Sequence, residues 1–364
     1  MSMKRILLLL GISLAGIAFA GDTASGPLSA VPPKEGDYLI HNFRVAGQTL
    51  QDVRMHYTTL GTPRRDAQGR VTNAVVVLHG TNRKGGIFMI PGFAGELFGP
   101  GQILDTSRYF IVLPDQFGAG LGKSTKPSDG LRGQFSHYDY ADMIRAVQIM
   151  LKDGLGVDHL RLLIGCSMGC MQGFMWGEST PDYMDGMMLL SCNPAEVAGR
   201  NRMVRKIMID DVRRDPGYMD GNYTNQPYGL RAAMGHLLVV GSAPSLWQKE
   251  YPTSALADKY VEEYIESNLK TTDANDFIYQ YDASRNYNPA PGLDKIRAHV
   301  SLVNVQDDFW NPGELDVARE GMQRVRNGEF VLLPVSDQTR GHYTFLSAPV
   351  WRPYLKALLE SLSK

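Results

Sequence analysis

The sequence predicts an α/β protein, in which a mostly parallel sheet is flanked by helices and interrupted by one helical insertion. Three observations carry this prediction. Short, continuously apolar runs of the kind buried on both faces alternate with segments of helical spacing. Polar residues suited to catalysis follow the carboxyl ends of these runs, where parallel sheets place their sites. Strand-like runs nearly vanish from residue 195 to 291, so we expect a helical lid at 195–291, inserted between core segments 37–194 and 292–364.

The composition limits the classes of function. The chain has 364 residues, of which 43% are hydrophobic and 21% charged, and its formal net charge is −1. This balance is ordinary for a globular protein and lacks the basic excess typical of nucleic-acid binding. The Gly-rich loop at 115–127 carries no phosphate-binding pattern, and no Cys/His cluster has zinc spacing. We therefore expect a small-molecule substrate and neither a metal nor a cofactor.

Residues 1–20 have the organisation of a cleaved signal peptide. The basic pair Lys4-Arg5 precedes an apolar segment, 6–18, which is too short for a comfortable membrane span. The sequence Ala18-Phe19-Ala20 is an A-x-A cleavage site. We expect a flexible lead at 21–36 and a periplasmic or secreted mature protein without a stable membrane anchor. An uncleaved anchor is the alternative.

The chain has three cysteines, an odd number for an oxidising compartment. Cys166 and Cys170 lie four residues apart, and on one helix face this spacing gives poor disulfide geometry. Cys192 follows a separate apolar run. We therefore expect three buried thiols.

The elements of the core follow one another from residue 38. Segments 38–50 and 53–60 alternate in polarity and predict an antiparallel pair at a sheet edge. Amphipathic spacing over 139–151, with Asp139 as a candidate cap, predicts a helix. Apolar runs predict buried strands at 74–78, 109–113, 160–164, 186–190, 299–305 and 330–334, and a last helix is expected over 350–362.

The stretch 161–175 contains Ser167 within the pattern G-x-S-x-G of a nucleophile elbow. An apolar strand precedes the pattern and a helix-length segment follows it, which is the context that gives it meaning. Glycine is needed at Gly165 and Gly169 because a side chain there would collide with the neighbouring chain. Ser167 would stand above the sheet at a helix N-terminus, which favours developing negative charge. A purely structural turn is the alternative.

A serine nucleophile needs a base to remove its proton and an acid to orient that base. In this arrangement the order along the chain is Ser, then Asp or Glu, then His. His342 follows the last predicted strand and is the candidate base. Asp307 and Asp308 both follow the strand at 299–305, and we favour Asp308 because it lies four residues before Pro312.

The oxyanion of an acyl-transfer intermediate needs backbone N–H donors. We expect one from Met168, directly after the serine, and one from Thr81, in the loop after the strand at 74–78. His79 in the same loop is expected to be structural, because it would lie beneath the oxyanion hole.

Taken together, these motifs resemble the homoserine O-acetyltransferase-like family of α/β-hydrolase enzymes. The similarity covers nearly all of the chain from about Tyr38. The motifs that carry it are GCSMGCMQGFMW at 165–176, DQFGAGLGKSTKP at 115–127, GRNRMVRKIMIDD at 199–211 and GHYTFL at 341–346.

The resemblance implies an α/β-hydrolase fold with a helical lid, which often takes part in homodimers. It also implies double displacement, in which acyl-CoA acylates the serine and an alcohol then takes the acyl group. Arg205 matches the lid arginine that binds the carboxylate of the acceptor. Tyr343 is a departure, because the family usually has an aspartate there that recognises the amino group of the acceptor.

Because of this departure and the signal peptide, we expect an exported serine ester hydrolase acting on a small acyl ester. The expected site comprises Ser167, Asp308 and His342, with Arg205 and Tyr343 contacting the substrate. A true O-acyltransferase that uses acyl-CoA is the first alternative. A non-catalytic binding protein on a hydrolase scaffold is the second.

Overall fold

The computed structural model describes residues 28–363. The predicted signal peptide and the lead up to residue 27 lie outside the described residues. Within the described part, one eight-stranded sheet has the order β1-β2-β4-β3-β5-β6-β7-β8. The strands are β1 (Lys34–Val45), β2 (Gln48–Leu60), β3 (Ala74–Leu78), β4 (Phe110–Pro114), β5 (Leu160–Cys166), β6 (Met184–Leu190), β7 (His299–Val305) and β8 (Gly328–Leu333).

The pairing of the strands confirms a mostly parallel sheet. The strands from β3 to β8 are parallel to their neighbours, whereas β1 pairs antiparallel with β2, and β2 pairs antiparallel with β4. All five residues of β3 and all five of β4 are buried, as expected of continuously apolar strands covered on both faces.

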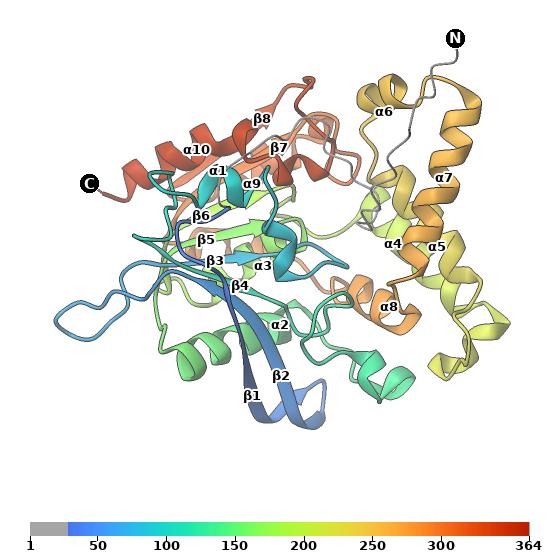
Figure 1. Cartoon of the computed structure of the whole chain (residues 1–364), viewed down its shortest axis with the longest axis horizontal. Helices are drawn as coiled ribbons and strands as arrows, with labels where there is room; N and C mark the ends of the chain where they lie inside the picture. Colours follow the sequence, from blue (N-terminus) through green and yellow to red (C-terminus); the bar gives the residue numbers. More distant parts are fainter. Residues whose placement is uncertain (1–27, 364) are drawn as a thin grey trace, which may run out of the picture.

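Helices cover both faces of the sheet (Figure 1). The core helices are α1 (Ala94–Leu97), α2 (Tyr140–Ile149), α3 (Met168–Ser179), α9 (Val317–Met322) and α10 (Ala348–Ser361). Side chains alternate across a strand, so Val76 and Leu78 pack in the hydrophobic cluster that contains α2 and α3. Val75 and Val77 pack in the second cluster, which contains α1 and α10.

The predicted antiparallel pair at the sheet edge is confirmed, but its first strand begins earlier in the sequence than predicted. Strand β1 begins at Lys34, three residues before the predicted start of the core at residue 37. Residues before it are also tied to the core, since the N–H of Ala30 donates to the carbonyl of Phe98 at 3.0 Å. The predicted bounds of the flexible lead are therefore wrong at residues 34–36, because these residues pair with β2 as part of β1.

The predicted helix over 139–151 is present as α2. Asp139 caps it, because its carboxylate accepts from the backbone N–H of Asp142 at 3.0 Å. The α-helix ends at Ile149 and continues as a π-helical turn over Met150–Gly154.

The predicted helical lid is also present between β6 and β7. In the described residues this segment contains helices and no strand: α4 (Gly199–Arg213), α5 (Gly229–Val240), α6 (Pro244–Glu250), α7 (Ser254–Leu269) and α8 (Ala274–Asp282). The lid helices gather on one side of the core, on the right in Figure 1. Among residues 28–363, no helix is both long and apolar enough to cross a membrane.

Candidate active site

Ser167 lies in the sharp turn between β5 and α3. Its φ of 54° and ψ of −111° are unusual for a residue other than glycine, so the backbone is strained at this position. Two hydrogen bonds hold the turn. The N–H of Ser167 donates to the carbonyl of Leu190 at 2.8 Å, and the carbonyl of Ser167 accepts from the N–H of Met171 at 3.1 Å.

Both elbow glycines are required by close backbone packing. A Cβ atom added to Gly165 would lie 2.4 Å from the carbonyl oxygen of Gly169, and one added to Gly169 would lie 2.3 Å from that of Leu78. The collisions expected from the sequence are therefore present. Because neither glycine has a Cβ atom, the start of α3 packs directly against β5 and β3.

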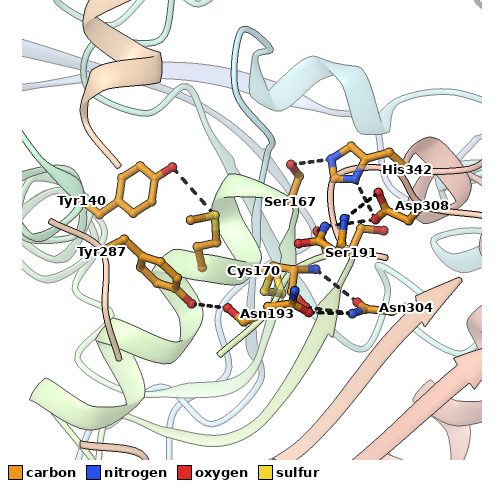
Figure 2. The surroundings of a disulfide bond; sticks show 12 residues. Tyr140, Ser167, Cys170, Ser191, Asn193, Tyr287, Asn304, Asp308 and His342 are labelled. Carbon is orange, nitrogen blue, oxygen red and sulfur yellow. Dashed lines mark hydrogen bonds and ion pairs between the residues drawn. A yellow bond between two sulfur atoms is a disulfide. The ribbon is translucent and has the colours of Figure 1, made fainter. Parts of the chain in front are cut away.

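Ser167, His342 and Asp308 form one chain of hydrogen bonds (Figure 2). The Oγ of Ser167 lies 2.8 Å from Nε2 of His342, and Nδ1 of His342 lies 2.9 Å from Oδ2 of Asp308. An imidazole protonated on Nδ1 donates to Asp308 and leaves Nε2 free to accept the serine proton. The three residues, which lie far apart in the sequence, thus have the geometry of an activated nucleophile.

The structure places Asp308, and not Asp307, against His342. Asp308 is fully buried, and its Oδ1 accepts from the backbone N–H groups of Trp310 at 2.8 Å and Asn311 at 3.2 Å. In contrast, Oδ1 of Asp307 is buried without a hydrogen-bond partner. Burial, and then the neighbouring charge of Asp308, raise the pKa of the Asp307 carboxyl.

Asn311 is a supporting residue that the sequence reasoning missed. Its Nδ2 donates to Oδ2 of Asp308 at 3.0 Å and to the carbonyl of Ser191 at 3.0 Å. It therefore fixes the carboxylate relative to the end of β6. Its position three residues after Asp308 was the signal that could have identified it.

The loop after β3 lies beside the nucleophile. A Cβ atom on Gly80 would lie 3.6 Å from Oγ of Ser167, and Thr81 lines the same cavity as Ser167. Met168 is the first residue of α3, so its N–H has no acceptor within the helix. The assignment of the Thr81 and Met168 N–H groups to an oxyanion hole stays a prediction.

His79 is the first residue of this loop and is fully buried. Its Nε2 accepts from the backbone N–H of Gln116 at 3.1 Å, so Nδ1 carries the proton and donates to the carbonyl of Gly80 at 2.8 Å. Burial lowers the pKa of His79 and keeps the ring neutral. These contacts agree with a structural role in which His79 positions the loop after β3.

Arg205 of the lid reaches the cavity in front of Ser167. Its side chain is buried, and its Nε donates to Oδ1 of Asn201 at 2.8 Å. The guanidinium lies over the ring of Trp310, 5.1 Å from the ring centroid. Arg205 is thus held rigidly, by a hydrogen bond and an aromatic face, with its charge directed at the site.

Tyr343 lines the same cavity, and its ring centroid lies 5.8 Å from that of His342. The guanidinium of Arg83 lies over the Tyr343 ring at 5.7 Å. Arg83 is a second residue that sequence reasoning missed. The sequence feature that could have identified Arg83 is its position two residues after Thr81, in a loop that follows a buried strand.

Known proteins share both the sequence pattern and the fold. A model of the alpha/beta hydrolase fold family matches residues 73–230. A homoserine O-acetyltransferase from Clavibacter michiganensis subsp. michiganensis is 29% identical over 344 residues, which cover 83% of this chain and 85% of that protein. The crystal structure of esterase E22 superposes with a TM-score of 0.76 at 17% identity, covering 90% of this chain and 100% of that one. A homoserine O-acetyltransferase from Bacillus anthracis superposes with a TM-score of 0.75 at 20% identity, covering 91% of this chain and 98% of that one.

The chain has the α/β-hydrolase fold. The predicted fold class and the resemblance to homoserine O-acetyltransferases are both confirmed. This α/β-hydrolase is therefore a serine enzyme that acts by acyl transfer. The solved structures demonstrate the fold alone, because their sequence identity is low.

The expectation of three free thiols in this α/β-hydrolase is wrong. Cys170 and Cys192 form a disulfide, with a distance of 5.9 Å between their Cα atoms, whereas Cys166 is a buried free thiol (Figure 2). The partner of Cys170 lies at the end of the neighbouring strand, which sequence spacing does not reveal. The bond ties the first turn of the nucleophile helix to the loop after β6.

The described part of this α/β-hydrolase, residues 28–363, contains no group of three or more His, Cys, Asp or Glu side chains placed to hold a metal ion.

Proposed function

We propose that the protein is an exported esterase that hydrolyses a small carboxylic ester through an acyl-serine. Oγ of Ser167 attacks the ester carbonyl while Nε2 of His342 takes its proton, and the N–H groups of Thr81 and Met168 hold the oxyanion. His342 then returns the proton to the alcohol oxygen as the C–O bond breaks. Water attacks the acyl-serine by the same route, and the carboxylic acid leaves with Ser167 restored.

Asp308 has a supporting role in this cycle. Its carboxylate keeps the proton of His342 on Nδ1 and stabilises the imidazolium that forms in each half-reaction. Because Trp310, Asn311 and His342 all donate hydrogen bonds to this buried carboxylate, it stays oriented without solvent.

The observation that supports hydrolysis over transfer to an amino-acid alcohol is the contact between Arg83 and Tyr343 beside His342. The guanidinium of Arg83 repels an ammonium group brought to this side of the site. The acyl-serine is then left to water, which needs no recognition group.

The proposal of export has two supports. One is the signal-like pattern of residues 1–20. The other is the disulfide between Cys170 and Cys192, because structural disulfides are typical of oxidising compartments.

An O-acyltransferase is the second candidate, and the curated relatives favour it. The relative from Clavibacter michiganensis carries the name homoserine O-acetyltransferase and matches over 83% of this chain. Both candidates share the acyl-Ser167 and differ only in the molecule that releases the acyl group.

Release of p-nitrophenol from p-nitrophenyl acetate tests the proposal. We expect steady turnover without an acceptor, unchanged by homoserine, and complete loss in Ser167→Ala. Ser107→Ala, an exposed serine in another loop, is the matched control and should retain the wild-type rate. Product that forms beyond one equivalent only when homoserine is added would identify a transferase. Equal rates in wild type and Ser167→Ala would refute the acyl-serine.

A further inference from the structure

Two arginines, Arg83 and Arg205, line the cavity of Ser167, and the contacts of both are to neutral groups. Nη1 of Arg83 donates to the carbonyl of Asn82 at 3.3 Å. Arg205 donates from Nε to the amide oxygen of Asn201 and from Nη1 to the hydroxyl of Ser284, at 2.8 and 3.2 Å. Both charges thus keep their full attraction for an anion that enters the cavity.

Each of the two guanidinium groups lies over an aromatic ring that is close to His342. The rings of Tyr343 and Trp310 lie close to the His342 ring, with centroids 5.8 and 6.1 Å from its own, as does the ring of Phe345 at 5.9 Å. Arg83 lies over Tyr343 at 5.7 Å, and Arg205 lies over Trp310 at 5.1 Å. Each arginine is therefore one aromatic ring away from the imidazole. Arg83 comes from the loop after β3, and Arg205 comes from lid helix α4.

This arrangement indicates the part of the substrate that the arginines meet. In the proposed reaction, Nε2 of His342 gives its proton to the leaving alcohol, so the alcohol oxygen must lie at this nitrogen. The rest of the alcohol then lies among the residues beside the imidazole, which include Tyr343 and Trp310. The acyl carbonyl points instead to the N–H groups of Thr81 and Met168, which the proposed function assigns to the oxyanion hole.

We propose that the alcohol part of the substrate carries two carboxylates, one for Arg83 and one for Arg205, as in the O-acyl ester of a hydroxy-dicarboxylic acid. This inference rests on the proposed function. A planar guanidinium fork matches a carboxylate with two parallel hydrogen bonds, and partial burial strengthens the pair. An alcohol with one carboxylate and one ammonium satisfies Arg205 but places its positive charge near Arg83.

Wild-type enzyme alone gives the first test. Acetate release is measured for the acetyl esters of malate, lactate and homoserine, which carry two carboxylates, one carboxylate, and one carboxylate with one ammonium. We expect kcat/KM for O-acetylmalate to exceed that for O-acetyllactate by roughly ten- to a hundredfold, the effect of one charged hydrogen-bonded contact. O-acetylhomoserine should be the poorest of the three. Equal values, or a preference for O-acetylhomoserine, would overturn the inference.

Variants then assign the second carboxylate to Arg83. In Arg83→Met the preference for O-acetylmalate over O-acetyllactate should fall to about one, and Arg83→Lys should restore part of it. Lys84→Met removes the same charge from the neighbouring exposed position and should keep the full preference. An unchanged preference in Arg83→Met contradicts the assignment. If that variant does not fold, the wild-type comparison still decides.

Failure of this inference differs from failure of the proposed function. Turnover of p-nitrophenyl acetate that depends on Ser167, without any preference among the three esters, refutes only the dicarboxylate. Loss of Ser167 dependence for every ester refutes the esterase itself.

Discussion

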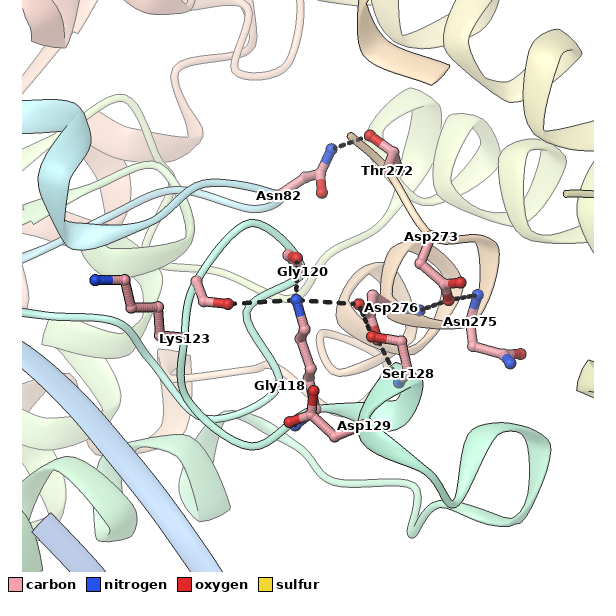
Figure 3. Close-up of polar contacts among 12 residues, drawn as sticks. Asn82, Gly118, Gly120, Lys123, Ser128, Asp129, Thr272, Asp273, Asn275 and Asp276 are labelled. Carbon is pink, nitrogen blue, oxygen red and sulfur yellow. Dashed lines mark hydrogen bonds and ion pairs between the residues drawn. The ribbon is translucent and has the colours of Figure 1, made fainter. Parts of the chain in front are cut away.

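Asp276 in lid helix α8 accepts two hydrogen bonds from Ser128 of the core, one from its backbone N–H at 2.8 Å and one from its hydroxyl at 2.6 Å (Figure 3). Nζ of Lys126 lies 3.7 Å from the same carboxylate. Asp276 is almost fully buried, and burial raises its pKa from 3.8 to about 7 despite these contacts. The lid is therefore fastened to the core by a group that titrates near neutral pH.

This contact predicts a pH dependence of stability. Below pH 4 the Asp276 carboxyl is protonated in both the folded and the unfolded chain. Between pH 4 and pH 7 the unfolded chain releases the proton and the folded chain keeps it, so the stabilising contribution falls as pH rises and is lost above about pH 7. The free energy of unfolding of wild type relative to Asp276→Asn should fall by a few kcal/mol across this range.

Urea unfolding of both proteins, measured from about pH 4.5 to about pH 8, gives this difference in the free energy of unfolding. Asp258→Asn, which removes an exposed carboxylate from lid helix α7, is the control and should show no such trend. A constant difference between wild type and Asp276→Asn would contradict the prediction.

The hydrogen bond between His342 and Asp308 predicts a large effect on rate. Asp308→Asn removes the acceptor that holds the His342 proton on Nδ1, so kcat for p-nitrophenyl acetate should fall about 10³- to 10⁴-fold. Asp307→Asn is the matched control at the adjacent position and should change kcat by less than about threefold. If Asp307→Asn is the more damaging substitution, the assignment of the acid is wrong.

The close packing at the elbow predicts that an alanine at Gly169 destabilises the protein, whereas an alanine at a glycine with open space around it does not. Gly169→Ala places a methyl group against the carbonyl of Leu78, and the backbone must move, so we expect a loss of about 2–4 kcal/mol. Gly235→Ala lies in helix α5, where a Cβ meets no atom within 4 Å, and should stabilise by about 0.5–1 kcal/mol. Chemical denaturation gives both values, and similar effects of the two substitutions would contradict the packing described for the elbow.

The disulfide predicts sensitivity to reductants. Cys170 and Cys192 are 22 residues apart, and cross-linking a loop of this length should stabilise the protein by about 3 kcal/mol. Thiol titration of the denatured, non-reduced protein should find one free thiol, that of Cys166. Reductant should lower the melting temperature of wild type and leave a Cys170→Ala/Cys192→Ala variant unaffected. Three titratable thiols in protein from an oxidising compartment would show that the bond does not form.

Several features of this protein could be predicted from the sequence because they depend on local structure. Apolar runs of strand length, the glycines of the elbow and the Asp139 cap act on neighbouring residues, so their pattern is visible in a short window. The order of Ser167, the aspartate pair and His342 could also be predicted, since each follows a strand that such a window reveals.

The tertiary structure alone decided the contacts between distant segments. The pairing of Cys170 with Cys192 and the approach of Arg83 to Tyr343 each join residues that only the sheet brings together. The spacing to Pro312 already favoured Asp308 over Asp307, but only the folded chain shows the hydrogen bond from His342 to Asp308. Strand β6 lies between β5 and β7, so the loops after these strands meet at one edge of the sheet. Distances there depend on strand order and helix packing, and sequence spacing does not encode them.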